Sequence, residues 1–246
     1  MAKPSRLPAP RDRAASTRMQ SPTASHVTYV SDRRGVPEVW IANRSEAWDR
    51  LLLAPGDVKV GAEPATGFAT PVFSPDARRI AVVASAQTGA AIYTTPASGT
   101  MPVRATAEPN PSEYGPTWSP DGRWLAFWRI GGAEMHLSKV RPGSGEPPVH
   151  LAPCWNRTVP AWARDGRTLY QARLDTRQLV AIDMATGRES PVRDLGELPP
   201  YSSVNAGWRA SITPDGSEFV YTVNRPREEI WILAGIRAPR PWRRPW

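Results

Sequence analysis

The sequence predicts an all-β fold, a β-propeller of four-stranded antiparallel blades, and three observations support this. The stretch Ser119-Pro120-Asp121-Gly122 is a turn motif that stands between two segments rich in strand-forming residues. The motif and its flanking residues recur along the chain at intervals of about 40 to 50 residues. The chain contains 28 prolines and 18 glycines, which suits many short strands joined by turns. A strand-type repeat of this length is typical of propellers, in which each repeat forms one blade.

Each residue of the turn has a physical role. Pro120 fixes φ at the second turn position, Asp121 bonds to its own backbone, and Gly122 supplies a left-handed residue, so we expect a positive φ at Gly122. The other clear copies place an aspartate at the same position, at Asp76, Asp165-Gly166 and Asp215-Gly216. The four aspartates are 45, 44 and 50 residues apart. Ala77 replaces the glycine in one copy, which predicts a strained or differently shaped turn.

The repeated aspartates invite a metal-binding or acid–base interpretation, but we favour a structural one. A turn of this type needs aspartate for its backbone hydrogen bonds, and the four aspartates belong to separate blades. The predicted structural turn residues are Asp76, Asp121, Gly122, Asp165, Gly166, Asp215 and Gly216.

The repeats predict one propeller domain, residues 21–236, between two basic tails. A first, weaker copy of the turn, Ser21-Pro22-Thr23-Ala24, lacks the Asp-Gly pair. The five predicted repeats lie near residues 21–53, 71–106, 116–151, 160–195 and 210–236. Repeat one lacks a recognisable inner strand, and repeat five lacks an outer strand. The repeats could therefore close into a five-bladed ring or form the C-terminal part of a six- or seven-bladed one.

Within each repeat, the segment after the turn predicts a hairpin of two further strands. The predicted second and third strands are 27–30 with 38–41, 80–84 with 91–94, 124–129 with 135–139, 168–172 with 179–182, and 218–223 with 230–233. The predicted outer strands are 50–53, 103–106, 149–151 and 192–195. Linkers that contain Gly99, Gly143 or Gly187 lead into three of these outer strands.

Both faces of the central strands are apolar, as in residues 124–128. A blade packed between two neighbours buries both of its faces, so strict alternation is lost. Several of the 11 tryptophans recur at fixed positions of the repeat, with Trp118 matching Trp162 and Trp40 matching Trp231. We expect these four side chains to pack in the core.

The repeated pattern P-x-W-S-P-D-G-x-x-L-A-F resembles the WD40-like propeller repeats of TolB-type proteins. The resemblance covers roughly residues 21–236 and rests on four clear copies of the turn in register. It implies a β-propeller that binds a protein or peptide partner. It also implies a periplasmic or other extracytoplasmic location if the chain is truncated before Met1. Repeats of this kind also occur beside peptidase, kinase and DNA-binding domains.

The net charge of +8 would ordinarily indicate a nucleic-acid or membrane-surface partner. The excess lies in the tails, because residues 1–20 and residues 237–246 each carry a net charge of +4. The body between them has 22 basic and 22 acidic residues. We therefore predict no nucleic-acid binding through the body. We interpret residues 1–20 as a disordered Pro/Arg-rich arm and residues 237–246 as a basic Pro/Trp tail.

The sequence contains no apolar run that approaches the ~18 residues of a transmembrane helix. Its N-terminus lacks the apolar core of a signal peptide. The sequence as written thus predicts no membrane span and, by default, a cytoplasmic location. The single Cys154 excludes an internal disulfide bond, and we interpret it as a small buried thiol. The oligomeric state stays open.

Motifs for catalysis do not occur in the sequence. It has no Gly-x-Ser-x-Gly elbow for a serine hydrolase and no glycine-rich phosphate loop of the Walker type. His26, His136 and His150 lie in different predicted strands without the spacing of metal ligands. We predict no catalytic residue, no metal and no cofactor.

Binding residues are expected in the loops ahead of the inner strands, at one mouth of the central channel. The candidates are Phe68, Tyr114, Arg157 and Trp208. Aromatic side chains and arginine are enriched among the anchors of protein interfaces. The alternative is that these side chains cap the core beneath the loops.

Three functions are consistent with these observations. The first is a non-enzymatic, TolB-type propeller module that binds a protein or peptide. The second is the sensory or gating propeller of a larger regulator or peptidase, truncated at its N-terminus. The third is a carbohydrate-active lyase or hydrolase with its site in the channel. Fold alone does not decide among them.

Overall fold

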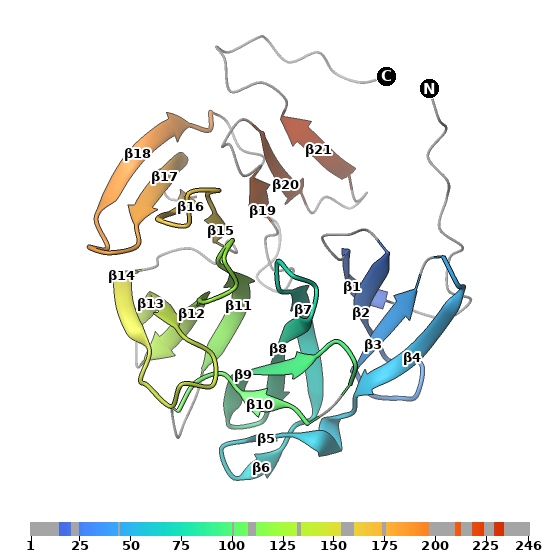
Figure 1. Ribbon diagram of the computed structural model, residues 1–246. Coiled ribbons are helices and arrows are strands. Elements are labelled where there is room, and N and C mark those ends of the chain that lie inside the picture. Colours follow the sequence, from blue (N-terminus) through green and yellow to red (C-terminus); the bar gives the residue numbers. More distant parts are fainter. Residues whose placement is uncertain are drawn as a thin grey trace, which may run out of the picture.

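Five antiparallel β-sheets form the body of the chain in the computed structural model (Figure 1). The structure describes residues 15–20, 25–43, 45–99, 101–107, 112–131, 134–153, 160–173, 176–196, 210–212, 218–223 and 229–233. Four sheets have four strands each, and the fifth has three within these residues. Figure 1 shows the first strand of each sheet nearest a common centre and the later strands further out. We number the sheets as blades one to five in chain order.

The strands of each blade follow one another in space in the order of the sequence. Blade one holds β1 (Ala15–Gln20), β2 (His26–Ser31), β3 (Glu38–Asn43) and β4 (Trp48–Leu53). Blade two holds β7 (Gly67–Phe73), β8 (Arg79–Ala86), β9 (Gly89–Pro96) and β10 (Val103–Arg104). Blade three holds β11 (Glu113–Trp118), β12 (Leu125–Gly131), β13 (Glu134–Val140) and β14 (Val149–Pro153). Blade four holds β15 (Ala161–Trp162), β16 (Thr168–Arg173), β17 (Gln178–Asp183) and β18 (Glu189–Asp194). Blade five holds β19 (Ala210–Ile212), β20 (Phe219–Val223) and β21 (Glu229–Leu233). The predicted second, third and outer strands are all present, with ends that differ by a few residues.

The expectation that repeat one lacks an inner strand is wrong. Residues Ala15–Gln20 form β1, which pairs antiparallel with β2. These residues belong to the stretch 1–20 that composition predicts to be a disordered arm. The strand Ala-Ser-Thr-Arg-Met-Gln has no apolar alternation to mark it. These residues form a strand because their backbone pairs with β2, and the intrinsic strand propensity of the residues does not reveal this pairing.

The inner strands β7 and β11 begin before the prolines at which the predicted repeats start. Each strand passes through a β-bulge just ahead of its proline. In these bulges Thr70 and Gly115 take positive φ values of 47° and 59°. A bulge accommodates a proline that has no N–H for the ladder, so the strand continues across Pro71 and Pro116.

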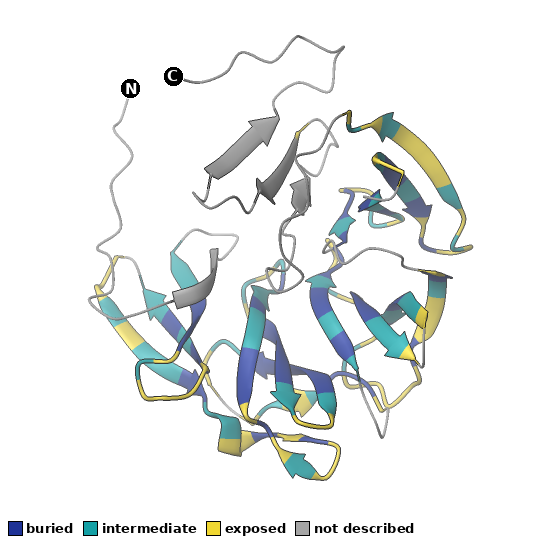
Figure 2. Cartoon of the chain, turned by 180° about the vertical axis from the view of Figure 1, so that it is seen from behind, coloured by how far each residue is buried: buried dark blue, intermediate teal, exposed yellow. Residues whose placement is uncertain are grey.

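The apolar core lies between successive blades. The alternate residues Ile80, Val82 and Ala84 of β8 pack with blade one. Ala81 and Val83 of the same strand pack with blade three. The strand is therefore apolar on both faces, as the sequence predicts. In Figure 2, buried residues lie on the inner and middle strands of blades two to four, and exposed residues lie along their outer strands.

The predicted core tryptophans have different outcomes. Trp118 and Trp162 are buried, which confirms the prediction for them. Trp40 is only half-buried, because it lies on the face of blade one that points away from blade two, as described below. The side chain of Trp231 lies outside the description of the structure.

The turn motif has the conformation that the sequence predicts. The φ angle is 68° at Gly122 and 64° at Gly166, which confirms the expectation for Gly122. Ala77 takes the same left-handed conformation, with φ 58°, so its turn keeps the shape of the others. An alanine in that conformation is strained, because its Cβ approaches the following carbonyl oxygen. Asp215 and Gly216 lie outside the described residues.

Hydrogen bonds within the turn explain its residue types. The N–H of Trp124 donates to Ser119 Oγ over 2.9 Å, and the N–H of Ser119 donates to the Trp124 carbonyl over 2.9 Å. Asp121 Oδ1 accepts from Ser119 Oγ at 2.5 Å and from the N–H of Arg123 at 3.0 Å. Each side chain thus satisfies backbone groups of the turn, which supports a structural role for Asp121.

The connection between blades one and two contains a short helix and a hairpin that were not predicted from the sequence. A short 3₁₀ helix at Pro55–Asp57 precedes a small hairpin of β5 (Lys59–Val60) and β6 (Glu63–Pro64). Val60 and Ala65 bury their side chains in the core between the two blades. No helix in the described ranges is long and apolar enough to cross a membrane.

Candidate functional site

Two of the four predicted channel-mouth residues lie within the described ranges. Phe68 on β7 is 4% exposed and packs in the core between blades one and two. Tyr114 on β11 is half-buried and contacts the cores on both sides of blade three. Arg157 and Trp208 lie outside the described residues. The burial of Phe68 fits the alternative that this side chain caps the core, and binding at the channel mouth stays a prediction.

The most distinctive polar arrangement lies on the face of blade one that points away from blade two. Val30, Val39 and Ile41 join the core shared with blade two. Successive residues of a strand point to opposite faces. Tyr29 and Trp40, which lie opposite each other on β2 and β3, therefore occupy the outer face.

The matching pairs in blades two and three have a different character. Val82 lies opposite Tyr93 in blade two, and Phe127 lies opposite Ser138 in blade three. All four of these residues are buried. In those blades the preceding blade covers the pair. In blade one, a side chain of the same blade covers Trp40 instead.

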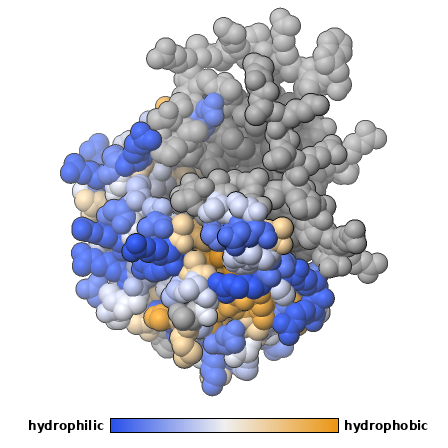
Figure 3. All heavy atoms as spheres, turned by 45° about the vertical axis from the view of Figure 1, so that its right-hand side comes forward, coloured by the Kyte–Doolittle hydropathy of each residue, from blue (hydrophilic) through white to orange (hydrophobic). Residues whose placement is uncertain are grey.

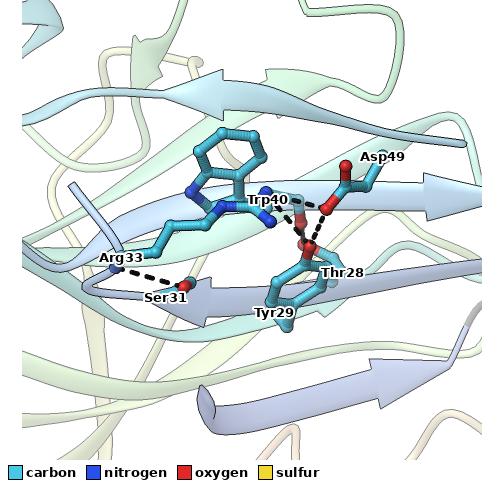
Figure 4. A network of polar contacts seen from close by, with 6 residues as sticks. All are labelled: Thr28, Tyr29, Ser31, Arg33, Trp40 and Asp49. Atoms are coloured by element: carbon cyan, nitrogen blue, oxygen red, sulfur yellow. Dashed lines mark hydrogen bonds and ion pairs between the residues drawn. The ribbon is translucent and has the colours of Figure 1, made fainter. Parts of the chain in front are cut away.

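That side chain is Arg33, from the turn between β2 and β3 (Figure 4). Its Cζ atom lies 3.3 Å from the centroid of the Trp40 ring. Its Nη2 donates to Asp49 Oδ2 on β4 over 2.8 Å and to the Tyr29 hydroxyl over 3.3 Å. The Tyr29 hydroxyl donates to the same carboxylate oxygen over 2.6 Å. The N–H of Arg33 donates to Ser31 Oγ over 3.3 Å and anchors the turn.

Burial and charge set the protonation of this network. Burial, and then the hydrogen bond to Asp49, raise the pKa of Tyr29 to about 12. The hydrogen bond from Tyr29 lowers the pKa of Asp49, although partial burial opposes this. Burial acts to lower the pKa of Arg33, but the hydrogen bond to Asp49 outweighs it and the net pKa is raised.

The network therefore holds a neutral phenol, a carboxylate and a guanidinium at neutral pH. A general acid or base works best when its pKa lies near the working pH, and none of these three groups meets that condition. The arrangement is suited to binding. Arg33 is 20% exposed and Asp49 is 40% exposed, so a partner can reach both charges.

Several N–H donors of this cluster have no acceptor among the described residues. The buried Trp40 Nε1 has no acceptor among the residues that the structure describes. Among the described residues, every side-chain hydrogen bond of Arg33 is donated by Nη2. The N–H groups of its Nε and Nη1 therefore have no acceptor among these residues. A buried N–H without an acceptor costs about 1–3 kcal/mol. The unused N–H groups of Arg33, whose side chain is 20% exposed, can donate to carbonyl or carboxylate oxygens of a ligand.

The side of the molecule that carries blade one comes forward in Figure 3. Hydrophilic residues predominate on its described surface, and a smaller area of hydrophobic residues lies among them. The Arg33 cluster was not predicted from the sequence because its members come from three strands and a turn. The signal available in the sequence was Trp40 at a repeat position with an arginine in the preceding turn.

The histidines are closer together than their positions in the sequence suggest. The His136 and His150 rings, on neighbouring strands, have centroids 5.2 Å apart. His136 Nε2 lies 3.1 Å from Glu134 Oε2, and Ser138 Oγ lies 3.2 Å from His150 Nδ1. No group of three or more His, Cys, Asp or Glu residues within the described ranges has the arrangement of a metal site.

Comparisons by sequence find no match. No protein-family model matches the chain, and no curated protein sequence is significantly similar to it.

Comparisons by structure identify the fold. TolB from Acinetobacter baumannii superposes with a TM-score of 0.63 at 20% identity, over 89% of this chain and 51% of that one. An oligogalacturonate lyase in complex with manganese gives 0.62 at 13% identity, over 90% and 65%. A puromycin-hydrolysing peptidase of Mycobacterium tuberculosis gives 0.58 at 16% identity, over 89% and 36%. The chain has a TolB-like β-propeller fold and spans about half the length of the A. baumannii protein.

Proposed function

We propose that this chain is a non-enzymatic, TolB-type β-propeller module that binds a protein or peptide partner. The observation that carries the proposal is the Arg33–Trp40 stack on the outer face of blade one. Tryptophan, tyrosine and arginine dominate the energetic centres of protein interfaces. Here Tyr29 and Asp49 hold the guanidinium in place before any partner arrives, which reduces the entropy lost on binding.

The donors without acceptors indicate the chemistry of the ligand. The unused N–H groups of the partly exposed Arg33 favour oxygen acceptors. A polypeptide offers one carbonyl oxygen per residue, and acidic side chains add carboxylates that fit a guanidinium. We therefore infer a polypeptide that brings backbone carbonyls or a carboxylate to Arg33. The periplasmic location that the TolB resemblance implies belongs to this proposal and is testable by cell fractionation.

Site-specific photo-cross-linking tests the proposal. A photoreactive residue replaces the exposed Arg34, next to Arg33, and a control replaces the exposed Glu146 in blade three. We expect one protein to cross-link at position 34 and not at position 146. The purified partner should then bind the purified chain. Turnover of oligogalacturonate with Mn²⁺, or of peptide substrates, by the chain alone would contradict a non-enzymatic function.

A second candidate is a gating or sensory propeller within a larger enzyme or regulator. The observation that favours it is the superposition with 36% of a peptidase chain. Under this alternative the polypeptide that contacts Arg33 is a domain of the same protein. The cross-link at position 34 would then form within one polypeptide and would be independent of protein concentration.

A further inference from the structure

Three arginines recur at one position of the repeat, directly after the left-handed residue that ends the turn motif. They are Arg78, Arg123 and Arg167, which are 45 and 44 residues apart. Each lies in the turn that joins the innermost strand of a blade to its second strand. All three are exposed. The aspartate and the left-handed residue after it set the backbone conformation of the turn, which does not require arginine at this position.

The three turns lie in contact with one another. A Cβ atom at Gly122 would lie 3.7 Å from Cδ of Pro75 in the preceding turn. A Cβ atom at Gly166 would lie 3.8 Å from Cδ of Pro120. Arg79 Nη2 donates to the Gly122 carbonyl oxygen over 2.8 Å and joins the first two turns. The turns of blades two, three and four therefore form a continuous row at the inner end of the blades (Figure 1).

The fold uses the backbone of these arginines and leaves their side chains to solvent. The N–H of each donates to the aspartate two residues before it, over 3.1, 3.0 and 2.8 Å. In the described part of the chain, no side-chain hydrogen bond or ion pair engages the three guanidinium groups. The aspartates are committed to the turns, so each turn presents a guanidinium with five N–H donors. We call Arg78, Arg123 and Arg167 the turn arginines.

We propose that the turn arginines bind an acidic polypeptide segment that lies across the turns of blades two to four. Carboxylates accept two parallel hydrogen bonds from a guanidinium, which gives both affinity and register. A guanidinium from each of three adjacent turns offers three such positions in a row. This surface is separate from the outer face of blade one and does not depend on the function proposed for that face.

The charge around the row favours a polypeptide over a nucleic acid. Asp76, Asp121 and Asp165 lie among the turn arginines, and the body of the chain carries equal numbers of acidic and basic residues. Nucleic-acid binding depends on a dense basic surface that neutralises regularly spaced phosphates. The carboxylates of an acidic peptide stand on rotatable side chains, so they can turn toward the guanidinium groups and away from the interleaved aspartates.

A binding assay with matched variants tests this. The probe is a fluorescent poly-Glu peptide, and a Gly/Ser peptide and an oligothymidylate of equal length serve as comparisons. One variant of the full chain combines Arg78→Gln, Arg123→Gln and Arg167→Gln. The control variant combines Arg34→Gln, Arg177→Gln and Arg188→Gln, which are also exposed. Both variants lose three charges and keep the basic tails, so non-specific attraction falls equally.

We expect the turn variant to bind poly-Glu at least about tenfold more weakly than wild type, and the control to change by less than about threefold. Single substitutions of the turn arginines should each weaken binding by about two- to fourfold, which keeps the test decisive if the triple variant unfolds. Equal losses in the two triple variants would overturn the proposal. So would wild-type binding of poly-Glu no tighter than of the Gly/Ser peptide, or a larger effect of the turn variant on oligothymidylate.

Discussion

The indole Nε1 of Trp162 donates a hydrogen bond of 3.2 Å to the carbonyl oxygen of Thr117 in the preceding blade. Trp118 repeats the contact one blade earlier, because its Nε1 donates to the Val72 carbonyl over 3.3 Å. Both rings are buried. The repeated tryptophan therefore fills the space between blades and also satisfies a carbonyl of the neighbouring inner strand.

Replacing Trp162 with phenylalanine should lower the free energy of unfolding by about 1–2 kcal/mol, because it leaves the Thr117 carbonyl without its donor while keeping most of the apolar contact. Urea denaturation measures this. Trp124→Phe is the matched control, because Trp124 is half-buried and lies under Lys139 and Arg141. An equal loss in both variants would show that the contact between blades adds nothing.

The left-handed turn residue should respond to substitution according to its φ angle. Gly122→Val should lower the free energy of unfolding by roughly 1–3 kcal/mol through backbone strain. Ala77→Gly should raise it by about 1 kcal/mol, because the native alanine already sits at φ 58°. Denaturation midpoints that moved in the same direction for both variants would contradict this account of the turn.

Gly187 has a stricter requirement than Gly143, its counterpart in blade three. A Cβ atom at Gly187 would lie 1.9 Å from the Leu151 carbonyl oxygen, whereas one at Gly143 would lie 3.7 Å from Val103 Cγ1. Both have positive φ. Gly187→Ala should cost about 2–4 kcal/mol, and Gly143→Ala should cost about 1 kcal/mol. Thermal unfolding of the two variants shows which one loses more stability. A larger loss for Gly143→Ala would refute the close approach of Gly187 to the Leu151 carbonyl oxygen.

Glu113 should make stability depend on pH. Its side chain is fully buried and accepts from the N–H of Ile92 over 3.1 Å, and burial raises the pKa of its carboxyl. The folded state therefore holds the proton more tightly than the unfolded chain, so stability falls as the pH rises through the raised pKa. Glu113→Gln removes this dependence.

The free energy of unfolding of Glu113→Gln, relative to wild type, should increase as the pH rises from about 4.3, the ordinary pKa of glutamate, toward neutral pH. Urea titrations across that range measure the difference. Glu146→Gln, at an exposed site, is the charge-matched control. A difference for Glu113→Gln that is constant with pH would mean that the carboxyl titrates normally in the folded chain.

The network on blade one predicts a spectroscopic signature. Tyr29 should ionise at about pH 12 in the wild type, and Asp49→Asn should move its pKa toward the ordinary value of about 10. The charge and hydrogen bond of Asp49 both favour the protonated phenol, so their loss lowers the pKa. Comparison with Tyr29→Phe by NMR of labelled tyrosine isolates the signal. An unchanged pKa in Asp49→Asn would show that the hydrogen bond is absent.

Most of the fold could be predicted from the sequence because the same pattern of strands and turns occurs in several repeats. The turn around Gly122, the apolar strand β8 and the outer strands each follow from local patterns that recur. Strand β1 could not be predicted, because its residues have no apolar alternation and pair through the backbone. The early start of β7 was missed because a bulge allows the strand to cross Pro71, which otherwise signals a strand end.

The sites were harder to predict than the fold. Proximity to a predicted inner strand suggested Phe68, yet its side chain turned out to be part of the core. The Arg33 cluster depends on contacts across three strands that no spacing reveals. The turn arginines were visible in the sequence, but only the stacking of the turns shows that they form a row.

We propose that the outer face of blade one binds a polypeptide through Arg33. The most direct test is the calorimetric affinity of the partner that cross-links at position 34 for the Arg33→Ala and Arg34→Ala variants. The two substitutions remove the same charge from one turn, but only Arg33 stacks on Trp40. We predict that Arg33→Ala weakens binding at least about tenfold and that Arg34→Ala changes it by less than about twofold. Equal affinities of the wild type and a folded Arg33→Ala variant would contradict the claim.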